Sequence, residues 1–547
     1  MFIWKMSIKP LSLFALVFLV QNTSLAFEDT LRQKFKAWTA GYPAEVRGEQ
    51  LASAALQIQF YNEQLFRSVW FSDGKANDQV YDLLREIESI EHEGLMPENY
   101  HLTNIKNLLA SHENNDRVEL EVLLSDALLT LALHLRMGKT DPSTLNDMWQ
   151  SKSRDFEPLK ILHQVAAGET PSTLFETLRP NQIRYFRLRD AARKLRVYKD
   201  REWPQVNVGP AMKPGSIDPR LTLVRQHLHF WQQEFGETDN LIDSQEGFIV
   251  TENPDHYDAH LEAAVIMFQQ QHGLDTDAII GKATLDALNT SPGERLQQLY
   301  LNMERWRWLD EDFGERFLVV NIADFTLRIY EKNEVVFEKP VIVGRQYRKT
   351  PVFSDRLRFI VFNPTWTVPH RLAVEDKLPD IQTDPTYLDR LGFKLYNIGT
   401  LELINHNEVD WTQYSRRNFP FRMVQSPGPL NALGQMKFMF PNSHDVYIHD
   451  TPGRDLFKKS ERAFSSGCIR LADPIELANY LLQNQKWDTD KLNALLESGE
   501  TKTVYLDSLL PVHVEYWTAW VDRANRLQFR KDIYNRDAPL WAALRSE

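Results

Sequence analysis

The stretch Ser465-Ser466-Gly467-Cys468-Ile469-Arg470-Leu471 contains the only cysteine of the chain. His449 lies nineteen positions before it, in Tyr447-Ile448-His449-Asp450-Thr451-Pro452. One thiol cannot form an intrachain disulfide, and a lone cysteine with a histidine elsewhere is typical of a nucleophile and its base. The alternative is a buried, inert cysteine, since cysteine is among the most buried residue types. The glycine before the cysteine and the histidine motif favour the nucleophile.

Strand alternation is expected to place the polar residues of these two stretches on common faces. Residues 446–449 are predicted to form a strand in which Tyr447 and His449 share one face. Cys468 and Arg470 likewise share a face if their segment is extended. The two stretches could therefore present a thiol and an imidazole to the same site.

The groups that assist the thiol are predicted from its neighbours. A helix capped by Asp473 and running to about residue 483 begins too far from Cys468 for its dipole to lower the thiol pKa. We therefore expect the His449 imidazole to lower it, by forming a thiolate–imidazolium pair. Because Gly467 permits a tight backbone approach, the amides of Gly467, Cys468 and Ser466 are candidates for an oxyanion hole.

A zinc site is an alternative use of this region. His444, Asp445, His449 and Cys468 are all possible ligands, but His444 and His449 have opposite parity in the strand. No pair among the four has the spacing of a zinc motif. The sequence therefore predicts no metal, and nothing in it indicates a cofactor.

The N-terminus resembles an export signal. Lys5 and Lys9 precede an apolar run over Leu11–Val20, and Ser24-Leu25-Ala26 has the small-x-small pattern of a cleavage site. Ten apolar residues are too few to span a membrane, so we expect a cleaved signal peptide, an extracytoplasmic, periplasmic location and no transmembrane helix in the mature chain. The formal net charge of −12 argues against a nucleic-acid partner.

Composition and periodicity predict a multi-domain α+β protein. Asp126–Met137 has a strong helical pattern that ends at Gly138. Four β-branched and aromatic runs between Phe317 and Val368 predict strands, the last of them over Phe359–Val368. The predicted parts are a signal peptide (1–26), a helical scaffold domain (27–215), a small three-helix module (216–291), a linking helix capped by Ser291 (292–315), a β-rich domain (316–507) and a C-terminal extension that adds an edge strand (508–547).

The small module resembles a peptidoglycan-binding domain. The match is carried by Phe268, Gln269, Gly273, Leu274, Asp277, Ile280, Gly281, Thr284 and Leu288. This domain usually has glycine after the aspartate, whereas Ala278 stands here. If the turn requires a positive φ, alanine strains it. The resemblance implies a glycan-binding module, and the alternative is a packing module with a degenerate groove.

The β-rich domain resembles the L,D-transpeptidase family. The signature is a histidine on a strand followed by Ser-x-Gly-Cys-x-Arg. Further matching stretches are Gly344 to Pro351, Asn363 to Pro369, Pro427 to Gly434, Lys437 to Asn442 and Tyr447 to Pro452. The domain order is similar to that of a large, multi-domain Gram-negative subgroup with an N-terminal scaffold.

The family resemblance implies a role for each matching residue. Cys468 would be the acylated nucleophile and His449 its base, with the backbone carbonyl of Asp450 orienting the imidazole. The carboxylate of Asp450 is not needed, and its alternative role is that of a turn residue. Arg470, Tyr447, Trp366 and Asn431 would bind substrate. For Arg470, a scaffold ion pair is the alternative.

The reaction that the resemblance implies is the cross-linking of peptidoglycan. Cys468 would attack a tetrapeptide stem, release D-alanine and form a thioester, and an amine of a second stem would then give a 3→3 link. Peptidoglycan stem peptides and glycan strands are the expected partners. Two alternatives stay open: an L,D-carboxypeptidase that resolves the same acyl-enzyme with water, and a non-catalytic wall-binding scaffold.

A long insertion separates the two halves of the predicted β-rich domain. It covers about residues 370–445 and begins with an amphipathic stretch over Arg371–Ile381. In the subgroup that the chain resembles, the corresponding segment looks like a lid over the active site. The alternative is an ordinary surface elaboration.

Overall fold

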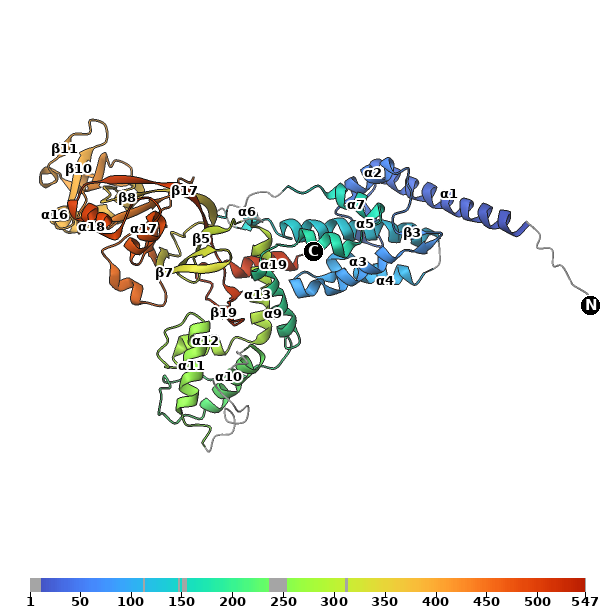
Figure 1. The fold of residues 1–547 in the computed structure, drawn as a ribbon, viewed down its shortest axis with the longest axis horizontal. Helices are drawn as coiled ribbons and strands as arrows, with labels where there is room; N and C mark the ends of the chain where they lie inside the picture. The colour runs from blue at the N-terminus through green and yellow to red at the C-terminus, as the bar shows by residue number, and fades with distance from the viewer. Residues whose placement is uncertain are drawn as a thin grey trace, which may run out of the picture.

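The structure, a computed structural model, describes residues 11–111, 114–145, 148–149, 155–235, 253–309 and 313–546. Figure 1 shows a helical part at one end, a β-rich part at the other and a small helical module projecting from the middle. The predicted multi-domain α+β architecture is confirmed. Within the described ranges, no helix combines the length and apolarity needed to cross a membrane.

Helix α5 (Asn114–Met137) forms the centre of the N-terminal part, and its leucines fill a helical core. It ends at Gly138, which takes φ 87° and lies so close to Trp308 that a Cβ would come within 2.7 Å of the indole nitrogen. The sequence predicted this helix and its end. The other helices here are α2 (Ala54–Glu63), α3 (Asp78–Ser89), α4 (Leu102–Leu109), α6 (Pro142–Leu145), α7 (Pro158–Ala166), α8 (Pro171–Leu178) and α9 (Ile183–Arg196). Two short hairpins join them, β1–β2 (Glu45–Val46, Glu49–Gln50) and β3–β4 (Phe71–Ser72, Lys75–Ala76).

Helix α1 (Leu11–Thr39) runs through Ala26, the predicted cleavage point. Its last turns belong to the scaffold, because Leu31 and Phe35 are buried in the same core as α5. Lys5 and Lys9, which carried the charged part of the predicted export signal, lie outside the described residues.

The small module consists of α10 (Leu221–Phe235), α11 (Ala259–Gln271) and α12 (Lys282–Leu288) around a shared apolar core. Ala278 takes φ 56°, so the turn has the left-handed conformation that glycine would adopt without strain. Two hydrogen bonds hold it there: its amide donates to Gln269 Oε1 at 3.0 Å, and Tyr257 donates to its carbonyl at 2.6 Å.

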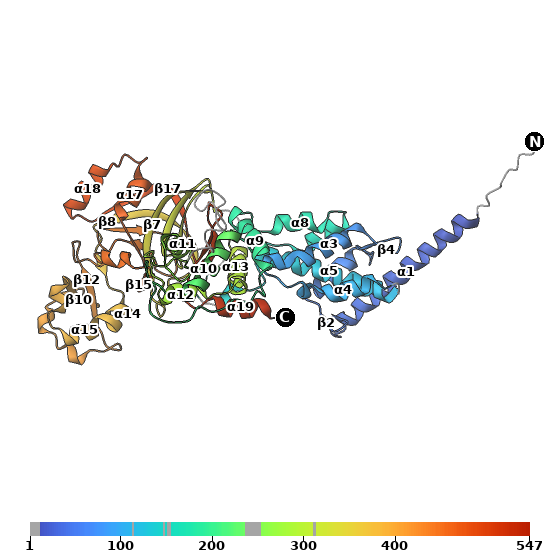
Figure 2. The same ribbon diagram turned by 90° about the horizontal axis from the view of Figure 1, so that it is seen from below.

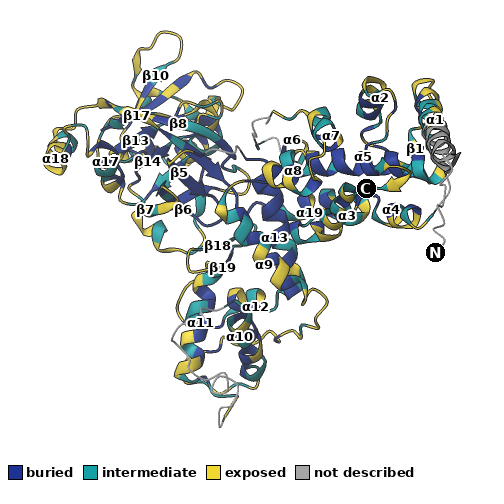
Figure 3. Ribbon diagram, turned by 45° about the vertical axis from the view of Figure 1, so that its right-hand side comes forward, coloured by how far each residue is buried: buried dark blue, intermediate teal, exposed yellow. Residues whose placement is uncertain are grey.

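Helix α13 (Pro292–Arg307) is buried along most of its length and joins the three parts (Figure 3). It begins with the predicted capping box, in which Ser291 Oγ accepts from the Glu294 amide and the Glu294 carboxylate accepts from the Ser291 amide. At its other end, the Arg307 guanidinium donates to the Glu93 carbonyl at 2.6 Å and to Glu304 at 2.8 Å. This buried network fixes the scaffold to the β-rich part.

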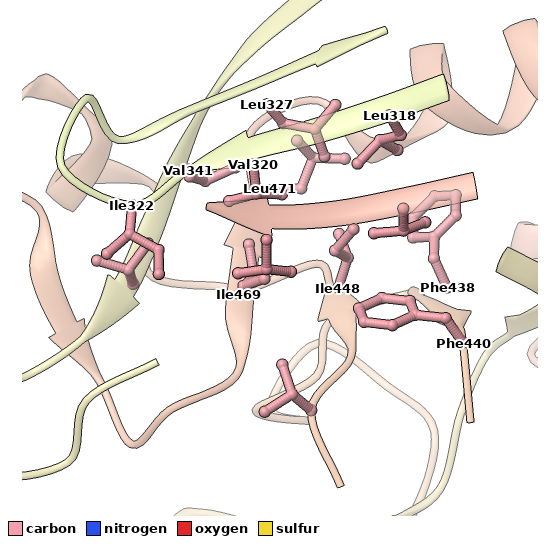
Figure 4. Packing of buried hydrophobic residues seen from close by; sticks show 14 of the residues in the cluster. Leu318, Val320, Ile322, Leu327, Val341, Phe438, Phe440, Ile448, Ile469 and Leu471 are labelled. Carbon is pink, nitrogen blue, oxygen red and sulfur yellow. The ribbon is translucent and has the colours of Figure 1, made fainter. Parts of the chain in front are cut away.

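The β-rich part is a nine-stranded sheet in the order β15-β7-β16-β14-β13-β8-β17-β5-β6, and a β6–β7 pairing brings its two ends together. The strands are β5 (Arg316–Asn321), β6 (Thr326–Glu331), β7 (Glu334–Gly344), β8 (Phe353–Phe362), β13 (Met436–Met439), β14 (Ile448–His449), β15 (Ala463–Ser465), β16 (Ile469–Leu471) and β17 (Lys502–Glu515). Alternation turns Phe438, Ile448, Ile469 and Leu471 into the apolar core (Figure 4). The opposite face of these strands is left for polar side chains.

Three predictions about this part are wrong. The Val512–Tyr516 segment is no edge strand, because β17 lies between β8 and β5 and runs across the predicted boundary at residue 507. The strand predicted to reach Val368 ends at Phe362, since Asn363 takes φ 45° and turns the chain away. Asp473 does not cap α17 (Pro474–Leu482) with its side chain, which faces Lys339 instead. The remaining elements are α18 (Thr489–Ser498), the β18–β19 hairpin (Ala519–Val521, Leu527–Phe529) and α19 (Asp537–Arg545).

The insertion is a folded subdomain with its own core. Its sheet has the order β11-β10-β12-β9, and Figure 2 shows it on the opposite side of the main sheet from α17 and α18. Its elements are β9 (Trp366–Thr367), α14 (His370–Leu372), a π-helical turn (Ala373–Lys377), α15 (Leu378–Thr383), α16 (Tyr387–Arg390), β10 (Phe393–Asn397), β11 (Leu403–Ile404) and β12 (Phe421–Gln425). The predicted range of 370–445 is too long, because β13 already belongs to the main sheet.

Candidate active site around Cys468

Three neighbouring strands place a row of polar side chains on one face of the main sheet. Lys437 on β13 stands opposite His449 on β14, and His449 stands beside Arg470 on β16. Tyr447 and Cys468 lie two residues before His449 and Arg470 and follow the same parity. The thiol and the imidazole therefore share the polar face of a sheet whose other face is core.

His449 is buried, and its Nδ1–H donates to the Asp450 carbonyl at 2.5 Å. A carbonyl oxygen can only accept, so the proton is on Nδ1 and the lone pair is on Nε2. Burial, together with the positive charges of Arg470 and Lys437, lowers the pKa of His449 to about 3. The imidazole is therefore neutral at physiological pH and has one nitrogen available to accept a proton.

The carboxylate of Asp450 holds a loop rather than the imidazole. It accepts from the Gln435 amide at 2.9 Å and from Arg454 at 3.2 Å. Gly434 makes this approach possible, because a Cβ on it would lie 2.3 Å from Asp450 Oδ2. These contacts agree with the alternative given for Asp450 in the sequence analysis, in which its carboxylate is part of a turn.

The half-buried Cys468 thiol is bordered by Tyr447 and Asp445. Its Sγ lies 3.8 Å from the Asp445 carbonyl, and Tyr447 hydrogen-bonds to it through both its backbone and its side chain. Burial raises the pKa of the thiol, and the Tyr447 hydrogen bonds and the charges of Lys437 and Arg470 oppose that rise. The sequence analysis expected His449 to lower the pKa of the thiol, but the groups that lower it are Tyr447, Lys437 and Arg470. A neutral thiol beside a neutral imidazole is thus the resting arrangement.

The loop before the cysteine is a tight turn held by hydrogen bonds. Gly467 takes φ 118°, and its amide donates to Ser465 Oγ at 3.1 Å, which in turn donates to the Cys468 carbonyl at 2.5 Å. The expectation that the Gly467 amide faces an oxyanion is therefore wrong for this conformation. The glycine permits the turn, and the turn engages its amide with Ser465. The amides of Ser466 and Cys468 stay candidates.

A second layer of contacts, which the sequence interpretation missed, fixes this loop. Thr350 Oγ1 donates to the Gly467 carbonyl at 2.8 Å. Tyr534, from the C-terminal extension, donates to the Gly344 carbonyl at 2.6 Å and accepts from the Thr350 amide at 3.1 Å. Lys437 was missed as well, although the alternation of residues 436–439 could have shown it facing the same side as His449.

The predicted substrate-binding residues fall into two groups. Arg470 is half-buried beside His449, and no carboxylate in the described part of the chain pairs with it; Trp366 hydrogen-bonds to Tyr447 at the base of the subdomain. Asn431, by contrast, is buried, and its amide nitrogen donates to the Pro364 carbonyl at 2.9 Å and the Ser426 carbonyl at 3.1 Å. Its role as a substrate ligand is contradicted, because its side chain is used to hold the loop.

Across the described residues, no three His, Cys, Asp or Glu side chains gather into a potential metal site. The groups that this site offers for chemistry are a thiol, an imidazole and the two backbone amides of Ser466 and Cys468.

Three segments of the chain match known protein families, and one of these segments contains the Cys468 site. Residues 315–504 match the family described as L,D-transpeptidase catalytic domain, and the Cys468 site lies within them. This part of the chain is similar to L,D-transpeptidase catalytic domains. Residues 55–191 match the family described as Scaffold domain, and residues 244–288 match the one described as "Putative peptidoglycan binding domain". The resemblance stated from the sequence is confirmed.

A relative and two solved structures are similar to the chain. A Haemophilus influenzae protein named "Putative L,D-transpeptidase" is 36% identical over 242 residues, which are 44% of this chain and 48% of the relative. The chain thus spans about half the length of the curated relative it matches. An L,D-transpeptidase from Mycobacterium smegmatis (14% identity, TM-score 0.18, 37% of this chain and 58% of that one) and one from Stackebrandtia nassauensis (13%, 0.22, 57% and 96%) share low overall similarity with it.

Substitutions at His449 and Asp450 should separate the ring from the carboxylate. We expect His449→Gln to slow acylation of the catalytic domain by about 10²- to 10⁴-fold, the usual range for loss of a general base. Asp450→Asn should cost far less, because Asn keeps an oxygen for the Gln435 amide and leaves the backbone carbonyl in place. Single-turnover acylation by a small β-lactam, with both variants checked for folding, measures the difference. Equal losses would place the carboxylate in the catalytic machinery.

The pH dependence of acylation should reflect the neutral imidazole. Because the pKa of His449 is lowered to about 3 and that of the thiol is raised, both groups keep their protonation states from about pH 5 to 8. The rate of acylation should therefore form a plateau across this range, and activity should fall only as pH drops toward the pKa of His449. A rate profile that rises through an apparent pKa near that of free histidine would contradict this arrangement.

Proposed function

We propose that the protein is a peptidoglycan L,D-transpeptidase that forms 3→3 cross-links through a thioester on Cys468. The observation that carries the proposal is the Cys468–His449 site itself, with the Asp450 carbonyl on Nδ1, inside an L,D-transpeptidase catalytic domain. The fixed tautomer supplies a base on the polar face of the sheet that carries the thiol.

In the proposed first step, His449 Nε2 takes the thiol proton as Sγ attacks the carbonyl that precedes the terminal D-alanine of a tetrapeptide stem. The amides of Cys468 and Ser466 stabilise the oxyanion that forms. The C–N bond then breaks, D-alanine leaves with the proton from His449, and a thioester remains on Cys468. Since the imidazole starts neutral, it can take the proton and return it within one cycle.

In the second step, an amine of a neighbouring stem attacks the thioester. His449 accepts the amine proton and returns a proton to the departing thiol, so the 3→3 amide forms and the enzyme is restored. Arg470 supports substrate binding, because a half-buried guanidinium without a carboxylate partner among the described residues suits a stem carboxylate.

The subdomain over residues 366–425 is proposed to act as a lid. The Arg348 guanidinium donates to Asp376 and Glu375 on its π-helical turn and also to Ser466 Oγ, at 2.6, 3.0 and 3.2 Å respectively. Trp366, at its base, reaches Tyr447. Arg348 thus bridges the subdomain to the loop that carries the thiol, where the subdomain could exclude water from the thioester.

The chain is proposed to work in the periplasm on peptidoglycan stem peptides, with its small module binding glycan strands. The support is the export-like N-terminus, the family of the catalytic domain and the peptidoglycan-binding match. Hydrolysis of the same thioester is the competing outcome, and it is decided by whether water or an amine reaches the acyl group first.

Product analysis tests the proposed reaction. Purified disaccharide-tetrapeptides incubated with the protein should give 3→3 dimers and free D-alanine, detected by chromatography and mass spectrometry. Cys468→Ala should give neither while keeping its fold, since one thiol contributes little packing. Tripeptides without dimers would establish the carboxypeptidase alternative. If the wild type gives no products, and Cys468→Ala is pulled down with isolated cell wall as well as the wild type is, the protein is only a binding scaffold.

Releasing the lid should change the product ratio. We expect Arg348→Gln to raise the ratio of hydrolysis to cross-linking by about two- to tenfold, because the subdomain loses its tie to the Ser466 loop. Acylation by a small β-lactam should change less. Arg371→Gln is the matched control, since Arg371 pairs with Glu375 from an exposed position. If both variants keep the wild-type product ratio, the subdomain is a surface elaboration.

A further inference from the structure

A cavity of about 550 Å³ lies where the scaffold, the small module and the catalytic domain meet. Its walls include residues of α9, α11, strands β5 and β6 and the β18–β19 hairpin. None of the residues that border the Cys468 thiol lines it. Ligand sites are frequent at such domain junctions, and this volume is within their usual range.

The charge of the cavity wall is opposite to that of the chain. The chain as a whole carries a formal net charge of −12. The cavity, by contrast, is lined by three acidic residues, Glu334, Glu338 and Asp522, and by six arginines, Arg184, Arg187, Arg328, Arg523, Arg526 and Arg530. The wall therefore has an excess of positive charge.

Four of the six arginines are neutralised by carboxylates. Arg328 and Arg530 both pair with Asp324, at 2.8 and 2.6 Å. Arg526 pairs with Asp522 at 3.0 Å, and Arg523 pairs with Glu334. These ion pairs build the wall and leave little charge for a ligand.

Arg184 and Arg187 differ from the other four. They lie one turn apart on α9, and within the described ranges neither has a carboxylate partner; Arg187 donates only to the Asp522 backbone carbonyl at 3.1 Å. The Arg184 guanidinium stacks 3.8 Å from the centroid of Tyr330. Burial is the main reason that the pKa of Arg184 is lowered, and the nearby guanidinium groups of Arg328, Arg523 and Arg187 add to the lowering.

The cavity also offers aromatic and amide groups. Trp520 is half-buried in its wall, with the guanidinium carbons of Arg530 and Arg328 at 4.7 and 5.9 Å from its ring centroid. Gln270 and Gln271, from α11 of the small module, also line the cavity. Planar aromatic and amide groups around a pair of guanidinium groups suit a ligand that combines a sugar ring with a carboxylate.

We propose that this junction cavity is a second binding site, separate from the Cys468 site, for a carboxylate-bearing saccharide segment of peptidoglycan. Arg184 and Arg187 bind the carboxylate, and Trp520 and the α11 glutamines contact the sugar. The identity of the polymer rests on the proposed function, whereas the carboxylate selectivity rests on the cavity alone. A ligand here touches α9, α11 and the β18–β19 hairpin at once, so it would hold the small module against the catalytic domain.

The experiment is calorimetric titration of the full chain with the disaccharide of N-acetylglucosamine and N-acetylmuramic acid. Its lactyl carboxylate is free, and it has no stem peptide to occupy the Cys468 site. The matched probe is the same disaccharide with the carboxylate converted to a carboxamide. A disaccharide-tetrapeptide, titrated after the thiol has been blocked with a β-lactam, tests whether a stem carboxylate can serve instead of the lactyl one.

The double variant Arg184→Gln and Arg187→Gln should bind the acidic probe about tenfold or more weakly than the wild type, as expected for lost charge-assisted contacts. Arg184→Lys with Arg187→Lys should retain most binding, and it also guards against misfolding of the glutamine variant. Arg189→Gln is the control, since Arg189 lies on the same helix but faces Glu93 and Glu176 outside the cavity.

Three results would overturn the proposal: no binding of either acidic probe to the wild type, equal binding of the carboxamide, or equal loss in Arg189→Gln and in the double variant. Acylation of Cys468 is measured in the same preparations. A protein that is acylated but binds no acidic saccharide refutes the second site alone, whereas one that binds the saccharide but is not acylated refutes the proposed function alone.

Discussion

The hydrogen bond from His449 Nδ1 to the Asp450 carbonyl is the constraint on which the site depends. It decides which ring nitrogen carries the proton and so which one faces outward as a base. The pairing of β14 with β13 and β16 keeps the ring in place, and the Asp450 carboxylate anchors the following turn to the Gln435 amide. Burial and the positive charges of Arg470 and Lys437 keep the ring neutral, because they outweigh the hydrogen bond to the Asp450 carbonyl, which by itself raises the pKa of His449. The base is therefore set by backbone geometry.

The cysteine loop depends on parts of the chain that are distant in sequence. The Gly467 carbonyl is held by Thr350, whose amide is held by Tyr534 near the C-terminus. The Ser466 hydroxyl accepts a hydrogen bond from Arg348, which also binds the subdomain over residues 366–425. The C-terminal extension, the strand end near Gly344 and the subdomain thus converge on one turn. Changes in any of them can reach the thiol without touching it.

Local patterns predicted much of this structure. Neighbouring residues were enough to predict the alternation around His449 and Cys468, the capping box at Ser291 and the end of α5 at Gly138. The predictions that were wrong concern residues whose partners are distant in the sequence. The partners of β17 lie more than a hundred residues away, so its central place could not be read from its alternation. Asn431 and the Gly467 amide were assigned to a ligand because their intramolecular partners were not visible in sequence. The thiol environment was misjudged for the same reason, since Lys437 comes from another strand.

The central claim is that Cys468 is an acylated nucleophile with His449 as its base. Intact-mass spectrometry of the full chain after exposure to a carbapenem tests it most directly, because a thioester on the only cysteine adds one adduct mass. We expect a single adduct on the wild type, none on Cys468→Ala and slow formation of the adduct on His449→Gln. An adduct of the same mass on Cys468→Ala, or none on the folded wild type, would contradict it.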